Sequence, residues 1–135
     1  MEQETSIFKT RVLVLINFIS LMGLALVFEF AKKSHWSNAL LVVEVLLILL
    51  FLVSFVFAFV KTGLWQFTHK SIGALDEREM ELTSKSLRYA YGIFTIFLLG
   101  MLLLYALFSL PISIVFVVVF LIFAHLLPAM VLAWI

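Results

Sequence analysis

The chain contains no cysteine among its 135 residues. Disulfide bonds, thiolate nucleophiles, thiol-ligated zinc, iron–sulfur clusters and palmitoylation are therefore excluded together. Charge is also scarce, since only 13% of the residues are Asp, Glu, Lys or Arg and the formal net charge is +1. A nucleic-acid-binding surface needs a concentrated basic patch, so this composition gives no reason to expect nucleic acid as a partner.

Apolar side chains are what the chain has in excess. They make up 65% of the residues, and the mean hydropathy is +1.24, whereas a soluble domain is about 45–50% apolar. A chain of this length forms one domain, and no soluble domain of this size has enough interior to hide so many Leu, Phe and Val side chains. The lipid bilayer is therefore the first predicted partner.

Four apolar runs of 19 to 22 residues account for most of this excess; they are residues 12–30, 39–60, 89–108 and 112–133. At a helical rise of about 1.5 Å per residue, each run is about 28–33 Å long, which matches a hydrocarbon core of about 30 Å. Backbone groups inside a bilayer must be paired within the segment, which favours helices. The sequence predicts an all-α membrane protein, a single bundle of four transmembrane helices.

Aromatic and basic residues predict how the helices sit in the membrane. All six Trp and Tyr residues fall near the ends of the runs, at the interfacial depth that these side chains prefer. Lys and Arg divide seven against two between the two sides, and the richer side is expected to be cytoplasmic. This places both termini and residues 61–88 in the cytoplasm, and the protein in the cell membrane. The seven are Lys9, Arg11, Lys61, Lys70, Arg78, Lys85 and Arg88, and the two are Lys32 and Lys33.

The connections between the runs carry turn and capping signals. Ser37 or Asn38 is a suitable N-cap for the second helix, and Pro111 suits the start of the fourth. Residues 61–88 form the long connection and hold most of the charge.

Within this connection, residues 75–88 are expected to be a helix that continues into the third run and projects two to three turns into the cytoplasm. Acidic residues come first and basic residues last, as the helix dipole favours. Glu81 and Lys85 are spaced for an ion pair, and Leu75, Leu82 and Tyr89 repeat every seven residues as an apolar seam for a neighbouring subunit. The candidate interaction residues are Leu75, Asp76, Glu77, Arg78, Glu79 and Leu82.

The segments Leu75-Asp76-Glu77-Arg78-Glu79 and Arg88-Tyr89-Ala90-Tyr91 resemble a juxtamembrane pattern in small uncharacterised prokaryotic multi-pass membrane proteins. The likeness covers about twenty residues, and those families carry no assigned activity. The resemblance implies a prokaryotic multi-pass membrane protein and nothing about its chemistry. A solvated, salt-bridged helix end is the simpler interpretation of these charges.

Polar side chains at membrane depth are few, and each is a functional candidate because its burial in lipid is costly. Their distances from the helix ends predict two layers separated by an apolar middle. The inner layer contains Asn17, Ser54, Thr95 and His125, and the outer layer contains Glu29, Glu44, Tyr105, Ser109 and Ser113.

His125 has two interpretations. One is a ligand to a haem or a chlorophyll-type pigment, beside Pro128, which frees the carbonyl of Ala124 and can kink the helix. The other is a hydrogen bond to Asn17, Thr95 or Ser54. His69 falls in a predicted loop, as does His35, so a bis-histidine haem within the chain is not expected. No metal centre is predicted.

Glu44 also has two interpretations, and Glu29 is a secondary candidate of the same kind. A carboxyl group at membrane depth can serve as a proton or cation site. Alternatively, Glu44 accepts a hydrogen bond from Tyr105 or pairs with Lys32 or Lys33 from the adjacent loop.

Three function classes are compatible with this sequence. The favoured one is an accessory or structural subunit of a larger membrane complex, packing on other subunits or on its own copies through bulky apolar helix faces. The second is a small oligomeric transporter or channel that uses Glu44, although small multidrug transporters carry their essential Glu in the first helix. The third is a pigment- or haem-binding subunit. An enzyme is not expected, because no nucleophile–base pair, HExxH motif or phosphate-binding glycine loop is present.

Overall fold

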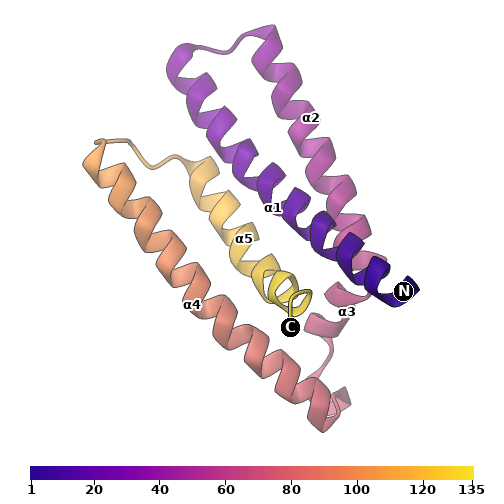
Figure 1. The fold of residues 1–135 in the computed structure, drawn as a ribbon. Helices are drawn as coiled ribbons and strands as arrows, with labels where there is room; N and C mark the ends of the chain where they lie inside the picture. Colours follow the sequence, from indigo (N-terminus) through magenta and orange to yellow (C-terminus); the bar gives the residue numbers. More distant parts are fainter. The chain divides into compact units, whose positions relative to one another are not determined.

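The computed structural model describes every residue from Met1 to Ile135 and is all-helical. Four helices are long and apolar enough to cross a membrane, which confirms the all-α fold and the number of apolar spans. The chain divides into two compact units, Met1–Gly63 and Leu64–Ile135, and each contains one antiparallel pair of long helices (Figure 1). The elements are α1 (Glu2–Ser34), α2 (Asn38–Phe55), η1 (Val56–Val60), α3 (Leu64–His69), η2 (Ile72–Ala74), α4 (Glu77–Leu107) and α5 (Ile114–Leu132).

The first unit is the hairpin of α1 and α2. The less exposed residues of α2 and η1 recur every three or four positions, as expected for one helix face packed along another. Leu47 belongs to this face, and its side chain lies 3.5 Å from the position that a Cβ on Gly23 would occupy. The face consists of Leu40, Glu44, Leu47, Phe51, Ser54 and Ala58.

The second apolar run ends in a π-helical turn, η1. The amide of Lys61 donates to the carbonyl of Val56 at 2.9 Å, a bond that spans five residues instead of four. The wider turn accommodates two consecutive buried side chains, Ala58 and Phe59. Short π-helical turns of this kind occur mostly as local widenings of α-helices.

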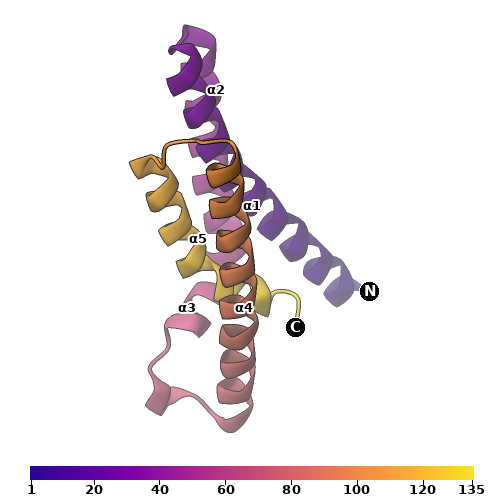
Figure 2. The same ribbon diagram turned by 90° about the vertical axis from the view of Figure 1, so that its left-hand side faces the viewer.

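The second unit is the hairpin of α4 and α5, with α3 beside the C-terminal part of α5 (Figures 1 and 2). Aromatic rings of the two long helices contact one another. Phe94 and Phe97 of α4 pack on Phe120 and Phe123 of α5, with ring centroids 5.4–6.2 Å apart. Aromatic pairs at such distances add about 0.5–1.5 kcal/mol beyond the area that they bury. α5 remains one helix through Pro128.

Serine side chains cap the starts of α2 and α5. Ser37 accepts a hydrogen bond from the amide of Leu40, which confirms Ser37 as the N-cap of α2. Ser113 caps α5 in the same way, accepting from the amide of Phe116. Pro111 therefore does not begin the helix, as the sequence suggested, but lies two residues before the cap. Ser113 occupies the N-cap position because its hydroxyl accepts a hydrogen bond from an amide that would otherwise be unpaired.

The residues after three helical segments have positive φ angles. These are His35 after α1, Gly63 after η1 and Ser109 after α4, with φ of 64°, 78° and 52°. This left-handed conformation ends a helix by turning the chain away from the helical path. Gly63 adopts it without steric cost, and it separates η1 from α3.

The connection at residues 61–88 is more ordered than the sequence predicted, because it contains α3 and η2. The helix predicted from residue 75 begins at Glu77, with Asp76 as its N-cap, and continues without a break to Leu107. Leu75 precedes this helix and caps η2 instead.

The apolar seam predicted at Leu75, Leu82 and Tyr89 does not form. Leu75 is outside α4, and the Tyr89 side chain is 52% exposed. The buried residues at this end of α4 are Ser86 and Ala90, on the face that leads to Phe94 and Phe97. Small side chains allow a neighbouring backbone to approach the helix closely. The predicted seam followed the larger residues instead, and these lie on a different face of the helix.

We predict that Asp76→Ala frays the first turn of α4. Asp76 accepts from the amide of Glu79 at 2.7 Å, and the Glu79 carboxylate accepts from the amide of Asp76 at 3.1 Å, so the substitution breaks a reciprocal capping box. The expected loss is about 0.5–2 kcal/mol of local helix stability, measured as faster hydrogen exchange at the Glu79 amide. Asp76→Asn keeps an acceptor at this position and should exchange much as the unmodified chain does; equal exchange in Asp76→Ala would contradict the assignment.

Candidate functional site

The predicted inner polar layer separates into different local arrangements. In the first unit, the Asn17 side-chain amide donates to the hydroxyl of Ser54 and to the carbonyl of Phe51, both at 3.1 Å. Asn17 and Ser54 are both buried, so their pairing joins α1 to α2. In the second unit, the Thr95 hydroxyl donates to the carbonyl of Tyr91 within its own helix, at 2.8 Å.

His125 contacts none of the partners that the sequence suggested. Its Nε2 lies 3.1 Å from Nε2 of His69, the last residue of α3. The prediction that His69 falls in a loop is therefore wrong, because the residues after Gly63 form a short helix that carries His69 to α5. The two imidazole rings have centroids 5.0 Å apart.

The ring of Trp65 contacts the rings of both histidines. Its indole stacks on the His69 ring at a centroid distance of 4.0 Å and meets the His125 ring edge-on at 5.3 Å. The Trp65 carbonyl lies 2.7 Å from Nδ1 of His69. Because a carbonyl oxygen only accepts, Nδ1 carries the proton and Nε2 of neutral His69 presents its lone pair to His125.

This arrangement bears on the suggested haem or pigment at His125. Both imidazoles are already in contact through Nε2, and Trp65 covers them on one side. Two axial imidazole nitrogens flanking a metal need about 4 Å between them, twice a metal–nitrogen bond of about 2.0 Å. A macrocycle on His125 would thus require His69 to move away.

Glu44 lies on the face of α2 that packs along α1, between Leu40 and Leu47. Its Oε2 is buried and has no hydrogen-bond partner, so the suggested pairing with Lys32 or Lys33 is absent, and both lysines are exposed. The ring of Tyr105, the other suggested partner, packs on Phe116 at 4.7 Å. Since α1 and α2 are antiparallel, Glu44 is level with the apolar turn of α1 that follows Gly23. Glu29 is half-buried nearer the end of α1.

At the charged end of α4, two of the predicted interaction residues make contacts within the chain. Asp76 and Glu79 form the capping box, and Lys70 pairs with Glu79 at 3.1 Å. Glu77 and Arg78 are exposed, while Leu75 and Leu82 are half-buried. The ion pair differs from the predicted one between Glu81 and Lys85, because η2 brings the chain before α4 back towards its first turn.

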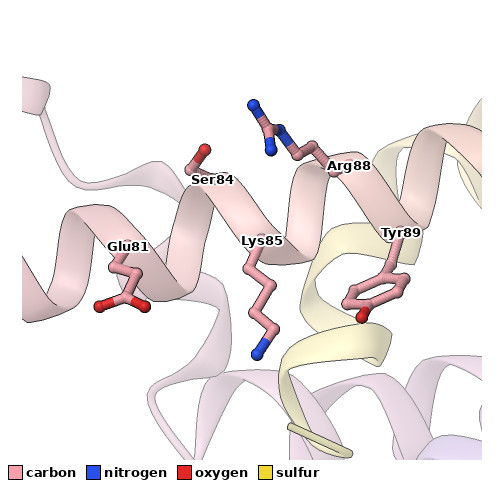
Figure 3. A pocket seen from close by; sticks show the side chains of 5 residues that line it. All are labelled: Glu81, Ser84, Lys85, Arg88 and Tyr89. Carbon is pink, nitrogen blue, oxygen red and sulfur yellow. The ribbon is translucent and has the colours of Figure 1, made fainter.

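An open hollow of about 520 Å³ lies further along the same helix, lined by Glu81, Ser84, Lys85, Arg88 and Tyr89. Figure 3 shows the side chains of Glu81, Lys85 and Tyr89 pointing to one side of α4, and those of Ser84 and Arg88 pointing elsewhere. All five residues come from one helix and are exposed. The hollow is therefore a shallow polar surface, without the enclosing walls of a catalytic pocket.

Sequence reasoning missed the His69–His125–Trp65 cluster, although one signal was available. The stretch Leu64-Trp-Gln-Phe-Thr-His69 has apolar or aromatic residues at 64, 65 and 67 and places Trp65 and His69 four positions apart. That spacing brings two side chains together on a helix. No group of three or more His, Cys, Asp or Glu residues is placed to hold a metal ion.

No protein-family model, curated protein or solved structure matches this chain.

We predict that Glu44→Leu stabilises the protein. A buried polar atom without a partner costs about 1–3 kcal/mol, and leucine of similar size completes the apolar face of α2. The gain should appear in the free energy of unfolding, measured by denaturant titration in detergent micelles. Glu44→Gln keeps a polar group and should gain little, and Glu29→Leu is a control outside this face. A destabilised Glu44→Leu would show that the carboxyl group has a favourable partner.

Proposed function

We propose that the chain is an accessory or structural subunit of a larger membrane complex. The observation that carries this proposal is the contrast among its four spans. Only 6% of the most apolar window of α2 is buried, and 6% of that of α4, against 50% for α5. α2 and α4 thus expose long surfaces of Leu, Val, Ile and Phe that another subunit or lipid can cover.

The internal polar groups support a structural role. The buried pair of Asn17 and Ser54 joins two helices of the same unit, and Ser20 donates to the carbonyl of Asn17. These contacts give local structure without exposing a hydrogen-bonding group to a substrate. A membrane enzyme has less support, since the polar hollow on α4 is shallow and open.

Photocrosslinking can test this proposal. A photoreactive amino acid at Leu49, on the exposed side of α2, should give a discrete protein adduct in native membranes, because a subunit interface holds one partner in a fixed place. The same residue at Leu46 samples another exposed position, and at Leu47, which faces α1, it should react mainly within the chain. Lipid adducts alone at every exposed position of α2 and α4 would contradict the proposal.

We further propose that both termini and residues 61–88 lie in the cytoplasm of a prokaryotic cell, in the cell membrane. Seven of the nine Lys and Arg residues lie on that side of the four spans, and this excess sets orientation in short loops. The capped, ion-paired start of α4 then projects from the membrane surface into water.

Topology reporters test the orientation. We predict that green fluorescent protein fused after Ile135 fluoresces and that alkaline phosphatase fused there is inactive, because the fusion site remains in the cytoplasm. Fusions placed after Ser34, in the loop between α1 and α2, provide the opposite control. Active phosphatase after Ile135 would reverse the proposed orientation.

A transporter or channel is the second candidate, and the unpartnered Oε2 of Glu44 favours it. A carboxyl group retained against a cost in stability is a known mark of intramembrane proton or cation sites. Proton-driven ²²Na⁺ or pH-dye flux in vesicles that is lost in Glu44→Gln would support this role over the structural one.

A further inference from the structure

We propose that His69 and His125 form a two-histidine site for a divalent transition-metal ion. The bound ion would link α3 to α5. The two Nε2 atoms are 3.1 Å apart and come from residues 56 positions apart in the sequence. Imidazole is the preferred nitrogen ligand for Zn²⁺, Cu²⁺ and Ni²⁺. The chain has three histidines, and two of them meet here.

The distance between the two nitrogens suits two ligands of one ion. With metal–nitrogen bonds of about 2.0–2.1 Å, adjacent ligands lie about 2.9 Å apart at a right angle and about 3.3 Å apart at a tetrahedral angle. The observed 3.1 Å falls between these two values. A small rotation of either ring therefore admits an ion without moving the backbone of α3 or α5.

Trp65 supplies the support that metal-binding histidines usually have. A ligating imidazole commonly donates its other N–H to a backbone carbonyl or carboxylate, which fixes the tautomer and the orientation of the ring. His69 Nδ1 makes this bond to the Trp65 carbonyl at 2.7 Å, and the stacked indole restrains the ring plane at 4.0 Å. The Trp65 contacts thereby keep the lone pair of His69 on Nε2, the nitrogen that faces His125.

Without a metal ion, one proton lies between the two Nε2 atoms. His125 must move this proton to its other nitrogen before it can bind an ion. Because His69 Nε2 carries the lone pair, His125 donates from its Nε2–H. Binding moves that proton to His125 Nδ1 through water, so that both Nε2 atoms are free to ligate and both rings remain neutral. Both histidines are exposed, so water can fill the remaining ligand positions.

Metal binding would change the stability of α3, the first segment of the second unit. α3 has six residues, a length that is marginal for an isolated helix, and Gly63 precedes it. An ion bridging His69 to His125 would restrain α3 on the end of α5, and through it the connection that leads to η2 and α4.

The test uses the full chain in lipid nanodiscs with one copy per disc, in a His35→Gln background. In discs whose scaffold protein lacks histidine, His69 and His125 are then the only imidazoles. Cu²⁺ alone is the probe for electron paramagnetic resonance, because it binds nitrogen ligands most strongly of the divalent series. We expect the spectrum to show two imidazole nitrogens on one Cu²⁺; one or none would overturn the proposal.

Zn²⁺ titration gives the second readout. We expect His69→Gln and His125→Gln each to weaken Zn²⁺ binding at least tenfold, since even the loss of an outer-shell partner costs about 10- to 100-fold. Zn²⁺ should also slow hydrogen exchange in residues 64–69 in the parent but not in His125→Gln. If either substitution leaves the Zn²⁺ affinity unchanged, or if Zn²⁺ does not change hydrogen exchange in α3, the two histidines only share a proton. The Cu²⁺ spectrum decides the question if a variant fails to fold.

Discussion

The constraint on which this structure depends is the pairing of every backbone polar group inside four apolar segments. Hydrocarbon offers no hydrogen bonds, so each segment must be a helix from end to end. Where the helical path changes, the structure keeps the backbone bonded. η1 replaces one α-turn with a π-turn whose last amide still reaches a carbonyl, that of Val56. α5 continues past Pro128 because a single missing donor does not end it.

Helix pairing is a separate problem, because lipid tails are as apolar as leucine and do not drive helices together. In the first unit a polar contact joins the two helices: the Asn17 amide of α1 donates to the Ser54 hydroxyl and to the Phe51 carbonyl of α2. Two buried side-chain atoms of this unit have no hydrogen-bond partner, Oδ1 of Asn17 and Oε2 of Glu44. In the second unit the two helices meet through the packed rings of Phe94, Phe97, Phe120 and Phe123.

The spans could be predicted from the sequence because hydropathy and length suffice for them. Residues 39–60 and 112–133 agree within two residues with Asn38–Val60 and Ile114–Leu132. The cap at Ser37 followed from local chemistry. The predicted seam at Leu75, Leu82 and Tyr89 was wrong because a seven-residue spacing carries no information on where the helix starts. Asp76 sets that start, and α4 then buries the smaller Ser86 and Ala90.

The candidate site depended on tertiary contacts that a single sequence does not specify. Depth along the helices placed Asn17 and Ser54 at similar levels, and they meet. The same argument grouped His125 with Thr95, yet rotation about the helix axis directs His125 to His69. His69 could not be placed because α3 has only six residues, too short for a periodic pattern to be read against the surrounding polar connection.

Single-cysteine labelling distinguishes contact of α2 with an apolar environment from contact with water. The chain has no cysteine, so each introduced thiol is the only one. In open membrane fragments, where both surfaces are accessible, a water-soluble maleimide should label cysteines at Ser37 and Thr62 and leave those at Val42, Leu46, Leu49 and Val53 unreacted. Labelling of these four α2 positions at the rate seen for Ser37 would show that water surrounds the helix and would contradict the account.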